Sequence, residues 1–149
     1  MTRRRLFLVM LVLTATLVLA ACGGDDDGSG SSGVSDPASV VEGYVAAYNA
    51  QDIERVMAFF AEDAVIIGDG GAERVEGAEA IRAEQLGNFD SHAPGGEAYS
   101  ISNLQATDNV VTWAYVFMGD AHTCVGTGDE AVVEDGEIVT WTRGPGSCD

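Results

Sequence analysis

The sequence predicts an α+β domain in which helices come first and a run of antiparallel strands follows. Apolar residues recur at helical spacing over residues 37–60 and again over 77–89, whereas from residue 98 onward they alternate with a period of two. Turn-forming residues stand at the breaks between the later runs, as hairpins require. The 149 residues suffice for one domain of ordinary size.

The amino-acid composition indicates a globular protein and excludes two kinds of partner. Hydrophobic residues make up 46% of the chain and charged residues 21%, which is typical of a globular protein. Asp and Glu number 24 against 7 basic residues, all of them arginine, for a formal net charge of −17. A chain without a basic stripe cannot displace counterions from phosphates, so nucleic acid is excluded as a partner. Polybasic adhesion to anionic lipid is excluded for the same reason.

The N-terminus carries the pattern of an export signal. Three arginines at 3–5 precede an apolar run over residues 6–21, which is shorter than the about 20 residues a spanning helix needs. The run ends in Leu19-Ala20-Ala21-Cys22, which resembles the lipobox of bacterial lipoprotein signal peptides. The resemblance implies that residues 1–21 are removed and that Cys22 is lipidated. The alternative is an uncleaved signal anchor in which Cys22 has no role.

A lipid on Cys22 would hold the protein to the cell membrane or envelope, facing outside the cytoplasm. Residues 22–36 then form a tether, because Gly, Ser and Asp residues give a flexible, self-repelling coil. A calcium site at Asp25–Asp27 is the alternative, but it lacks the spaced ligands of a calcium loop.

Two helices are predicted at the start of the folded domain. Asp36-Pro37 is typical of a helix N-cap followed by proline at the first helical position, and apolar spacing continues the helix to residue 50. Asp52 can cap a second, short helix whose apolar face ends at Phe60.

The next segments alternate between strand, turn and helix signals. A β-branched run predicts a buried strand, glycines predict a turn, and a third helix with few large contacts precedes a Pro/Gly loop. In order, the strand covers 64–67, the turn 68–71, a short second strand 72–76, the helix 77–89 and the loop 90–96. Four period-two strands follow, over 98–106, 110–118, 122–133 and 137–142.

Two segments carry a family resemblance. The stretch Tyr44–Asp52 and the stretch Phe59–Val65 resemble the start of nuclear transport factor 2-like domains, a superfamily that includes SnoaL-like polyketide cyclases and ketosteroid isomerases. The turn at 134–138 resembles the hairpin before their last strand. The resemblance implies a SnoaL-like domain over 37–143, with a tail at 144–149. Its expected fold is a cone in which three N-terminal helices pack on a curved, mostly antiparallel sheet around an apolar pocket.

Aromatic residues are the candidates for the pocket wall. On the strand 110–118, Trp113, Tyr115 and Phe117 share one face and smaller residues share the other, as in a sheet covered on both sides. In this superfamily the second cover is often a partner subunit, which implies a homodimer through the sheet face. The alternative is that the aromatic stripe is core or dimer interface. The expected ligand-binding residues are Tyr44, Tyr48, Phe60, Trp113, Tyr115, Phe117 and Asp129.

Acid–base chemistry is only partly supported by the resemblance. Ketosteroid isomerases place an oxyanion-binding tyrosine where this chain has Tyr44, but their proton-shuttling aspartate falls on Gly68, with Asp69 one residue later. Their second donor corresponds to Asp129 or Glu130. Candidate catalytic residues are therefore Tyr44, Asp69 and His122, and the sequence supplies no secure general base.

The two histidines of the chain, His92 and His122, are further candidates for a functional role. Related dehydratases use a histidine, and His122 heads a predicted strand that could point it into the cup, whereas His92 lies in the Pro/Gly loop. Two histidines 30 residues apart without a supporting acid pattern do not make a zinc site. No phosphate or dinucleotide fingerprint is present, so we expect neither a metal nor a cofactor.

Cys124 and Cys148 remain once Cys22 is assigned to lipid. An even pair in an oxidising compartment predicts a disulfide, which would fasten the C-terminal tail onto the sheet. The alternative is two free thiols.

Three functions remain open. The chain could bind a small, partly apolar molecule in the pocket without transforming it. It could be an acid–base enzyme of the cyclase, dehydratase or isomerase kind. It could be an interaction module that meets another envelope protein. Since no general base is secure, the sequence favours the first.

Overall fold

The computed structural model describes residues 36–91 and 98–149. The predicted signal segment, Cys22, the tether as far as residue 35 and His92 lie outside the described residues. Within the described part of the chain, no helix is long and apolar enough to cross a membrane.

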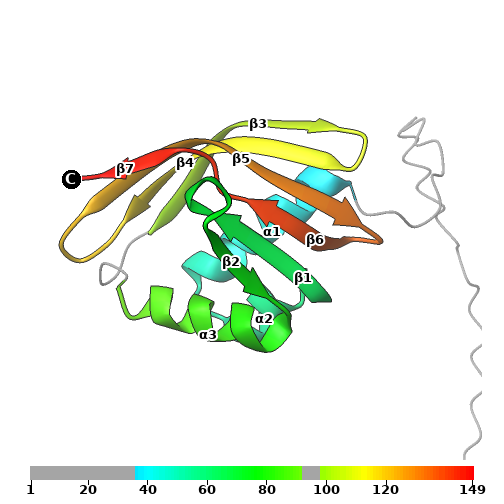
Figure 1. Cartoon of the computed structure of the whole chain (residues 1–149), viewed down its shortest axis with the longest axis horizontal. Helices are drawn as coiled ribbons and strands as arrows, with labels where there is room; N and C mark the ends of the chain where they lie inside the picture. The colour runs from blue at the N-terminus through cyan, green and yellow to red at the C-terminus, as the bar shows by residue number, and fades with distance from the viewer. Residues whose placement is uncertain (1–35, 92–97) are drawn as a thin grey trace, which may run out of the picture. The chain divides into compact units, whose positions relative to one another are not determined.

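Helices and strands follow one another as the sequence predicts, with one further strand at the end (Figure 1). The described elements are α1 (Pro37–Asn49), α2 (Ile53–Met57), β1 (Phe60–Gly68), a 3-10 turn η1 (Asp69–Gly71), β2 (Glu73–Glu76), α3 (Ala78–Phe89), β3 (Tyr99–Thr107), β4 (Val110–Met118), β5 (Thr123–Glu134), β6 (Glu137–Thr142) and β7 (Gly146–Cys148).

The strands form one mixed sheet in the order β2-β1-β6-β5-β4-β3. All neighbours are antiparallel except β1 and β6, which run parallel. β6 pairs with residues 130–134 of β5, and β7 pairs with residues 124–126 of the same strand. The last two strands therefore follow each other along one side of β5, which brings the C-terminus back onto the sheet.

The sheet bends at Trp113. On the β3 side, two residues, Asn103 and Leu104, stand opposite this one residue, and on the β5 side Gly128 is inserted between the partners of Trp113 and Ala114. Both insertions are β-bulges, which bend and twist a strand. Asn103 and Gly128 adopt φ values of 54° and 75°, as bulges of this kind require.

Helices cover one face of the bent sheet (Figure 1). α1 packs against β3, β4 and β5, and α3 packs against β1 and β2. The core between them is apolar and closed: Val41, Ile81, Val111 and Ile138 each expose at most 1% of their surface. Burying such side chains is the main stabilisation of a domain this size.

The structure confirms the α+β class and the curved, mostly antiparallel sheet, and it corrects two element boundaries. The second helix ends at Met57, so Phe60 begins β1 instead of ending the helix. There it pairs in parallel with Ile138 of β6, and this pairing is a long-range contact that local apolar spacing does not report. The predicted tail contains strand β7.

Candidate binding site

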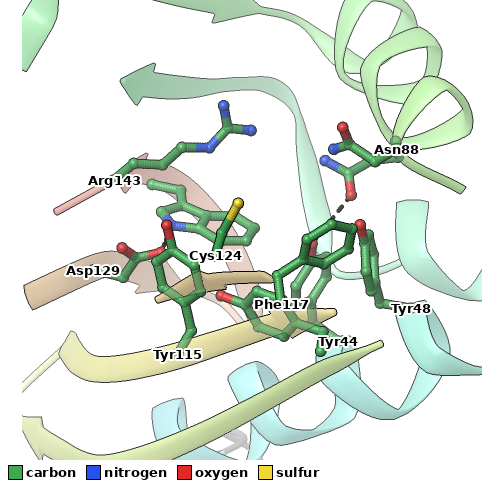
Figure 2. A pocket seen from close by; sticks show the side chains of 11 residues that line it. Tyr44, Tyr48, Asn88, Tyr115, Phe117, Cys124, Asp129 and Arg143 are labelled. Carbon is green, nitrogen blue, oxygen red and sulfur yellow. Dashed lines mark hydrogen bonds between the residues drawn. The ribbon is translucent and has the colours of Figure 1, made fainter. Parts of the chain in front are cut away.

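A cavity of about 270 Å³ lies between the helices α1 and α3 and the bent half of the sheet. Figure 2 shows Tyr115, Asp129 and Arg143 on one side of it and Tyr48 and Asn88 on the other. Eleven described residues line the cavity: Tyr44, Tyr48, Gln85, Asn88, Tyr99, Tyr115, Phe117, Cys124, Asp129, Trp141 and Arg143.

Six of these side chains are aromatic, and their rings hold one another in place. The Tyr44 ring meets the Trp141 ring edge-on, with centroids 5.0 Å apart. Tyr99 and Tyr115 stack with centroids 5.6 Å apart and an angle of 15° between their planes. Offset and edge-to-face pairs are the arrangements that aromatic rings prefer. The cavity therefore has a rigid, largely apolar wall.

Tyr44 joins the two helices at the helical side of the wall. The side chain is 2% exposed, and its hydroxyl donates to Oε1 of Gln85 on α3 at 3.1 Å. Burial raises the pKa of the Tyr44 hydroxyl well above its ordinary value. The proton of Tyr44 is thus directed to a protein amide and not to a guest, which differs from the oxyanion-binding role suggested by the isomerase resemblance.

Asp129 lies in the sheet side of the wall and is 1% exposed. Its Oδ2 accepts from the indole Nε1 of Trp141 at 3.0 Å, and its Oδ1 accepts from the backbone N–H of Gly144 at 2.9 Å. Burial raises the pKa of the Asp129 carboxyl, and these two donors oppose the rise. Each oxygen has a fixed donor, yet each retains a second lone pair for another partner.

Tyr99 offers a hydroxyl proton. Its oxygen accepts from the indole Nε1 of Trp113 at 3.1 Å, and an indole N–H can only donate. The hydroxyl proton is therefore left for another acceptor, and no acceptor for it is found among the described residues. Asn49 fixes the start of β3, because its amide bonds both the N–H and the carbonyl of Tyr99, at 2.9 and 2.7 Å.

Arg143 is the basic residue in the wall, and acidic side chains occupy its guanidinium. Nη2 donates to Glu84 of α3, and Nη1 donates to Glu73 at 3.4 Å. The guanidinium carbon also lies 6.0 Å from the ring centroid of Trp141, within the range of a cation–π contact.

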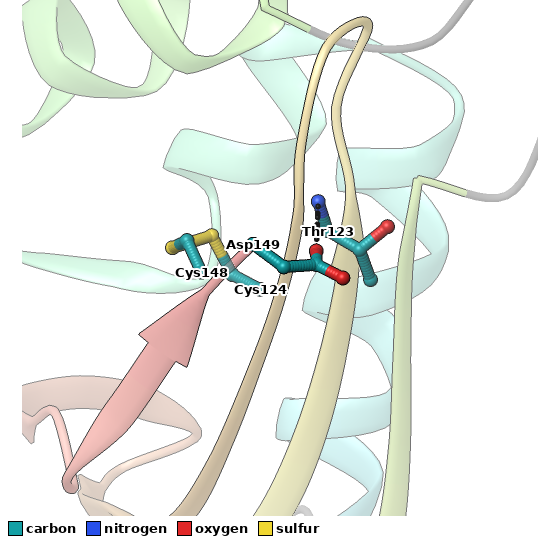
Figure 3. The surroundings of a disulfide bond; sticks show 4 residues. All are labelled: Thr123, Cys124, Cys148 and Asp149. Carbon is teal, nitrogen blue, oxygen red and sulfur yellow. Dashed lines mark hydrogen bonds between the residues drawn. A yellow bond between two sulfur atoms is a disulfide. The ribbon is translucent and has the colours of Figure 1, made fainter.

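The C-terminal tail closes part of the wall through a disulfide. Cys124 of β5 and Cys148 of β7 are bonded, as predicted, and Cys124 lines the cavity. Figure 3 shows the bond beside a second clamp, in which the backbone N–H of Thr123 donates to the carboxylate of Asp149 at 3.1 Å. Since Gly144 follows β6 and precedes β7, fixing the tail also fixes the N–H that holds Asp129.

The structure distributes the expected ligand-binding residues between two layers. Tyr44, Tyr48, Tyr115, Phe117 and Asp129 line the cavity. The other two expected residues lie in the core behind this wall: Phe60 is 4% exposed and Trp113 is 3% exposed.

Of the two remaining candidate catalytic residues, His122 is not among the described residues that line the cavity. Asp69 belongs to the turn η1 between β1 and β2, and its side chain lies outside the described part. Gly68 is buried at the end of β1, where an added Cβ would meet the carboxylate of Glu73 at 2.6 Å. His122 is exposed, with its ring 6.0 Å from that of Phe117.

Six lining residues were absent from the expected set: Gln85, Asn88, Tyr99, Cys124, Trp141 and Arg143. Two of them carry a signal in the sequence. Gln85 stands four positions after Ile81, so it is a polar residue on the buried face of a helix. Trp141 stands between Thr140 and Thr142 on β6, so period-two alternation places its ring on the face opposite to these two polar residues. The other four are brought to the cavity by tertiary structure, which local sequence patterns do not report.

No group of three or more His, Cys, Asp or Glu side chains that could hold a metal ion occurs among residues 36–91 and 98–149.

A cup of helices on a bent sheet with one aromatic cavity is the architecture of nuclear transport factor 2-like domains. The sequence profile of the SnoaL-like domain matches residues 41–144, and the chain belongs to this family. No curated protein matches the chain at a significant level.

Solved structures share the fold at low sequence identity. A candidate ketosteroid isomerase from Kribbella flavida DSM 17836 is 19% identical over 71% of this chain and 74% of its own, with a TM-score of 0.60. A candidate polyketide cyclase from Sinorhizobium meliloti is 17% identical over 70% and 92%, with a TM-score of 0.56. A protein of ketosteroid isomerase-like fold from Catenulispora acidiphila DSM 44928, in complex with trimethylamine, is 14% identical over 69% and 82%, with a TM-score of 0.56.

Proposed function

We propose that the protein is an extracytoplasmic lipoprotein whose SnoaL-like domain binds a small, partly apolar molecule without transforming it. The observation that carries the proposal is the cavity of about 270 Å³, with its aromatic wall and two polar groups, the Tyr99 hydroxyl and the Asp129 carboxylate. An apolar cleft with a few fixed polar groups is the general form of a small-molecule site. A neighbour of the same fold, from Catenulispora acidiphila, holds a small amine.

Binding fits the geometry better than the isomerase type of catalysis does. That chemistry needs a free donor for an oxyanion and a carboxylate that moves a proton. Here the Tyr44 hydroxyl donates to Gln85, and the position of the isomerase base is Gly68. The two groups that the chemistry requires are therefore not brought together in the cavity.

An acid–base enzyme of the cyclase, dehydratase or isomerase type is the second candidate, and Asp129 favours it. The carboxyl is buried in the cavity wall, and burial raises its pKa, as it does for many catalytic acids. Such an enzyme would use Asp129 with the proton of Tyr99, and Asp129→Asn would abolish turnover while a guest still bound.

The lipoprotein part of the proposal rests on the basic start, the apolar run and Cys22. The disulfide supports an oxidising compartment, since cytosolic thiols are kept reduced. Cells treated with an inhibitor of lipoprotein signal peptidase should accumulate a heavier precursor. An unchanged mass would contradict lipidation and leave the cavity proposal standing.

Native mass spectrometry of the protein purified from its host tests the binding proposal. We expect an adduct of small mass that denaturation releases. Asn88→Trp, which adds bulk to the cavity wall, should lose the adduct. Leu86→Trp is the matched control, because Leu86 lies on the same helix and is 45% exposed. A folded protein that carries no adduct, or an adduct that Asn88→Trp retains, would contradict the proposal.

A further inference from the structure

We propose that the guest of the cavity is a small cation, an alkylated ammonium ion whose charge is met by Asp129 and by the surrounding rings. This inference rests on the proposed binding function and names the class of molecule bound.

The charged groups around the cavity leave an excess of negative charge. Arg143 is paired with two carboxylates, Glu84 and Glu73, so its charge is more than neutralised. Asp129 has only neutral hydrogen-bond donors, the Trp141 indole and the Gly144 N–H, and no ion pair joins it to a basic residue in the described part of the chain. The charge of Arg143 acts on Asp129 without forming an ion pair with it, and it is shared with two other carboxylates. A buried carboxylate without an ion pair is costly. A cationic guest would supply the missing charge.

Glu84 adds to the same excess of negative charge. One of its oxygens, Oε1, pairs with Arg143, whereas the other, Oε2, is buried without a hydrogen-bond partner among the described residues. Asp129 and Arg143 line the cavity, and Glu84 and Glu73 bind Arg143 from outside the lining. In this cluster three acidic groups therefore meet one basic group. The local field therefore has the sign that attracts cations, as does the formal charge of −17 on the whole chain.

The aromatic wall of the cavity also favours a cation. Tyrosine and tryptophan faces attract a cation within about 6 Å of the ring centroid, and this attraction grows when water is excluded. Six of the eleven lining side chains are aromatic. The ring of Trp141 already accommodates one cation in this way, the guanidinium of Arg143 at 6.0 Å. An alkylated ammonium ion suits such a wall because its surface is apolar and its charge needs no strong hydrogen bond.

Other guests fit less well. An anion would have to compete with Glu84 and Glu73 for Arg143, and it would face Asp129. A neutral apolar guest would desolvate Asp129 further without compensating its charge. The volume of about 270 Å³ equals about nine water-sized volumes of about 30 Å³, which holds an ion of the size of choline.

Titration with a pair of isosteric probes tests the inference. Choline and 3,3-dimethyl-1-butanol have the same shape, but a carbon replaces the quaternary nitrogen in the second. The full-length chain, purified in an uncharged maltoside detergent, is titrated with each probe by calorimetry. We expect choline to bind at least about tenfold more tightly, which is the range of a desolvated cation–π contact.

Two matched pairs of variants locate the preference. Asp129→Asn and Glu130→Gln each remove one negative charge from adjacent positions of β5 whose side chains face opposite sides. We expect choline to lose its advantage in Asp129→Asn and to keep it in Glu130→Gln. Tyr115→Phe keeps a ring in the wall and should bind choline within about twofold of the wild type, whereas Tyr115→Leu should lose most of the preference. Circular dichroism checks that each variant is folded.

The outcomes separate this inference from the binding proposal. Equal affinity for choline and its neutral isostere would overturn the cationic guest and leave a cavity that binds small apolar molecules. A preference for choline that survives Asp129→Asn and Tyr115→Leu would also overturn the cationic guest proposed for this cavity, because other groups would then recognise the charge of choline. If choline does not bind at all, the inference fails, while the adduct found by native mass spectrometry still decides the binding proposal.

Discussion

Trp113 and Trp141 are buried to nearly the same extent, yet they stand on opposite sides of the boundary between core and cavity. Their exposed fractions are 3% and 4%, and their ring centroids are 5.6 Å apart. Each indole N–H donates to a side-chain oxygen, Trp113 to the Tyr99 hydroxyl and Trp141 to Asp129. Only Trp141 lines the cavity.

The bend of the sheet explains the difference. Trp113 stands at the bulges on both neighbouring strands. Before it on β4, Val111 is fully buried in the core, and after it Tyr115 and Phe117 line the cavity. All four side chains share the inner face of one strand. Burial and alternation identify the inner face, whereas the bend decides which part of that face is filled and which is open.

The largest expected effect is a difference in stability between variants that lose a side chain on one side of the bend or on the other. Trp113→Ala removes a core ring and should lower the free energy of unfolding by about 3–5 kcal/mol. Phe117→Ala removes a half-buried ring that borders an existing cavity, and it should cost about 1–2 kcal/mol. Urea unfolding followed by circular dichroism measures both. Equal losses would show that the cavity side is packed like the core.

Local sequence patterns predict part of this arrangement. Helical spacing and period-two alternation predict the element order, and the even cysteine pair predicts the disulfide. The same alternation predicts that Trp113 and Phe117 share a face, but it cannot separate them, because the bulge at Gly128 is a property of strand pairing. Tyr99 and Arg143 reach the cavity through the bend and the sheet order, and local patterns report neither.

Removing the disulfide should have the second largest effect. Cys124 and Cys148 are 24 positions apart, and opening a loop of this size should cost about 3 kcal/mol. The double variant Cys124→Ser/Cys148→Ser tests this in urea, and dithiothreitol should weaken the wild type but not the variant. Thiol titration of the unreduced, denatured mature protein is the direct check, since two reactive thiols there would contradict the bond in the isolated protein.

A substitution in the tail should disturb the cavity side alone. Gly144→Ala would bring its Cβ against the backbone oxygen of Thr127, so the tail must shift, at a cost of about 1–3 kcal/mol. The shift moves the Gly144 N–H away from Asp129 and should also weaken choline binding.

Gly87→Ala is the control for Gly144→Ala. Gly87 lies within α3, where nothing stands within 4 Å of an added Cβ, and alanine is the better helix former. We expect Gly87→Ala to leave choline binding unchanged and stability unchanged or slightly raised. Normal choline affinity in Gly144→Ala would show that the tail does not position Asp129.

The smallest expected effect is a change of choline affinity with pH. Choline keeps its charge at every pH, so any titration belongs to the protein. Burial raises the pKa of the Asp129 carboxyl, and choline affinity should fall as the pH drops through that raised value, by less than about tenfold per pH unit. The charged and titratable groups that act on Asp129 are Arg143, Tyr99 and Tyr115, whose raised pKa values keep their charge constant in this range.

The unliganded protein should show the opposite sign. Because the folded state binds the Asp129 proton more tightly than the unfolded state, the contribution of this group to stability is greatest at low pH. That contribution is lost as the pH rises through the raised pKa. Glu130→Gln should retain both dependences and Asp129→Asn should lack them. An affinity for choline that does not change on acidification would remove Asp129 from the site.

The two indole N–H signals of the chain provide the most direct test of a guest in the cavity. The chain has two tryptophans, so a ¹⁵N-labelled sample gives two indole resonances, which Trp113→Phe and Trp141→Phe assign. On addition of choline, the signal of Trp141 should shift strongly, because its ring and its partner Asp129 form the wall, and the signal of Trp113 should shift much less. Equal shifts, or a shift of Trp113 alone, would contradict a guest bound in this cavity.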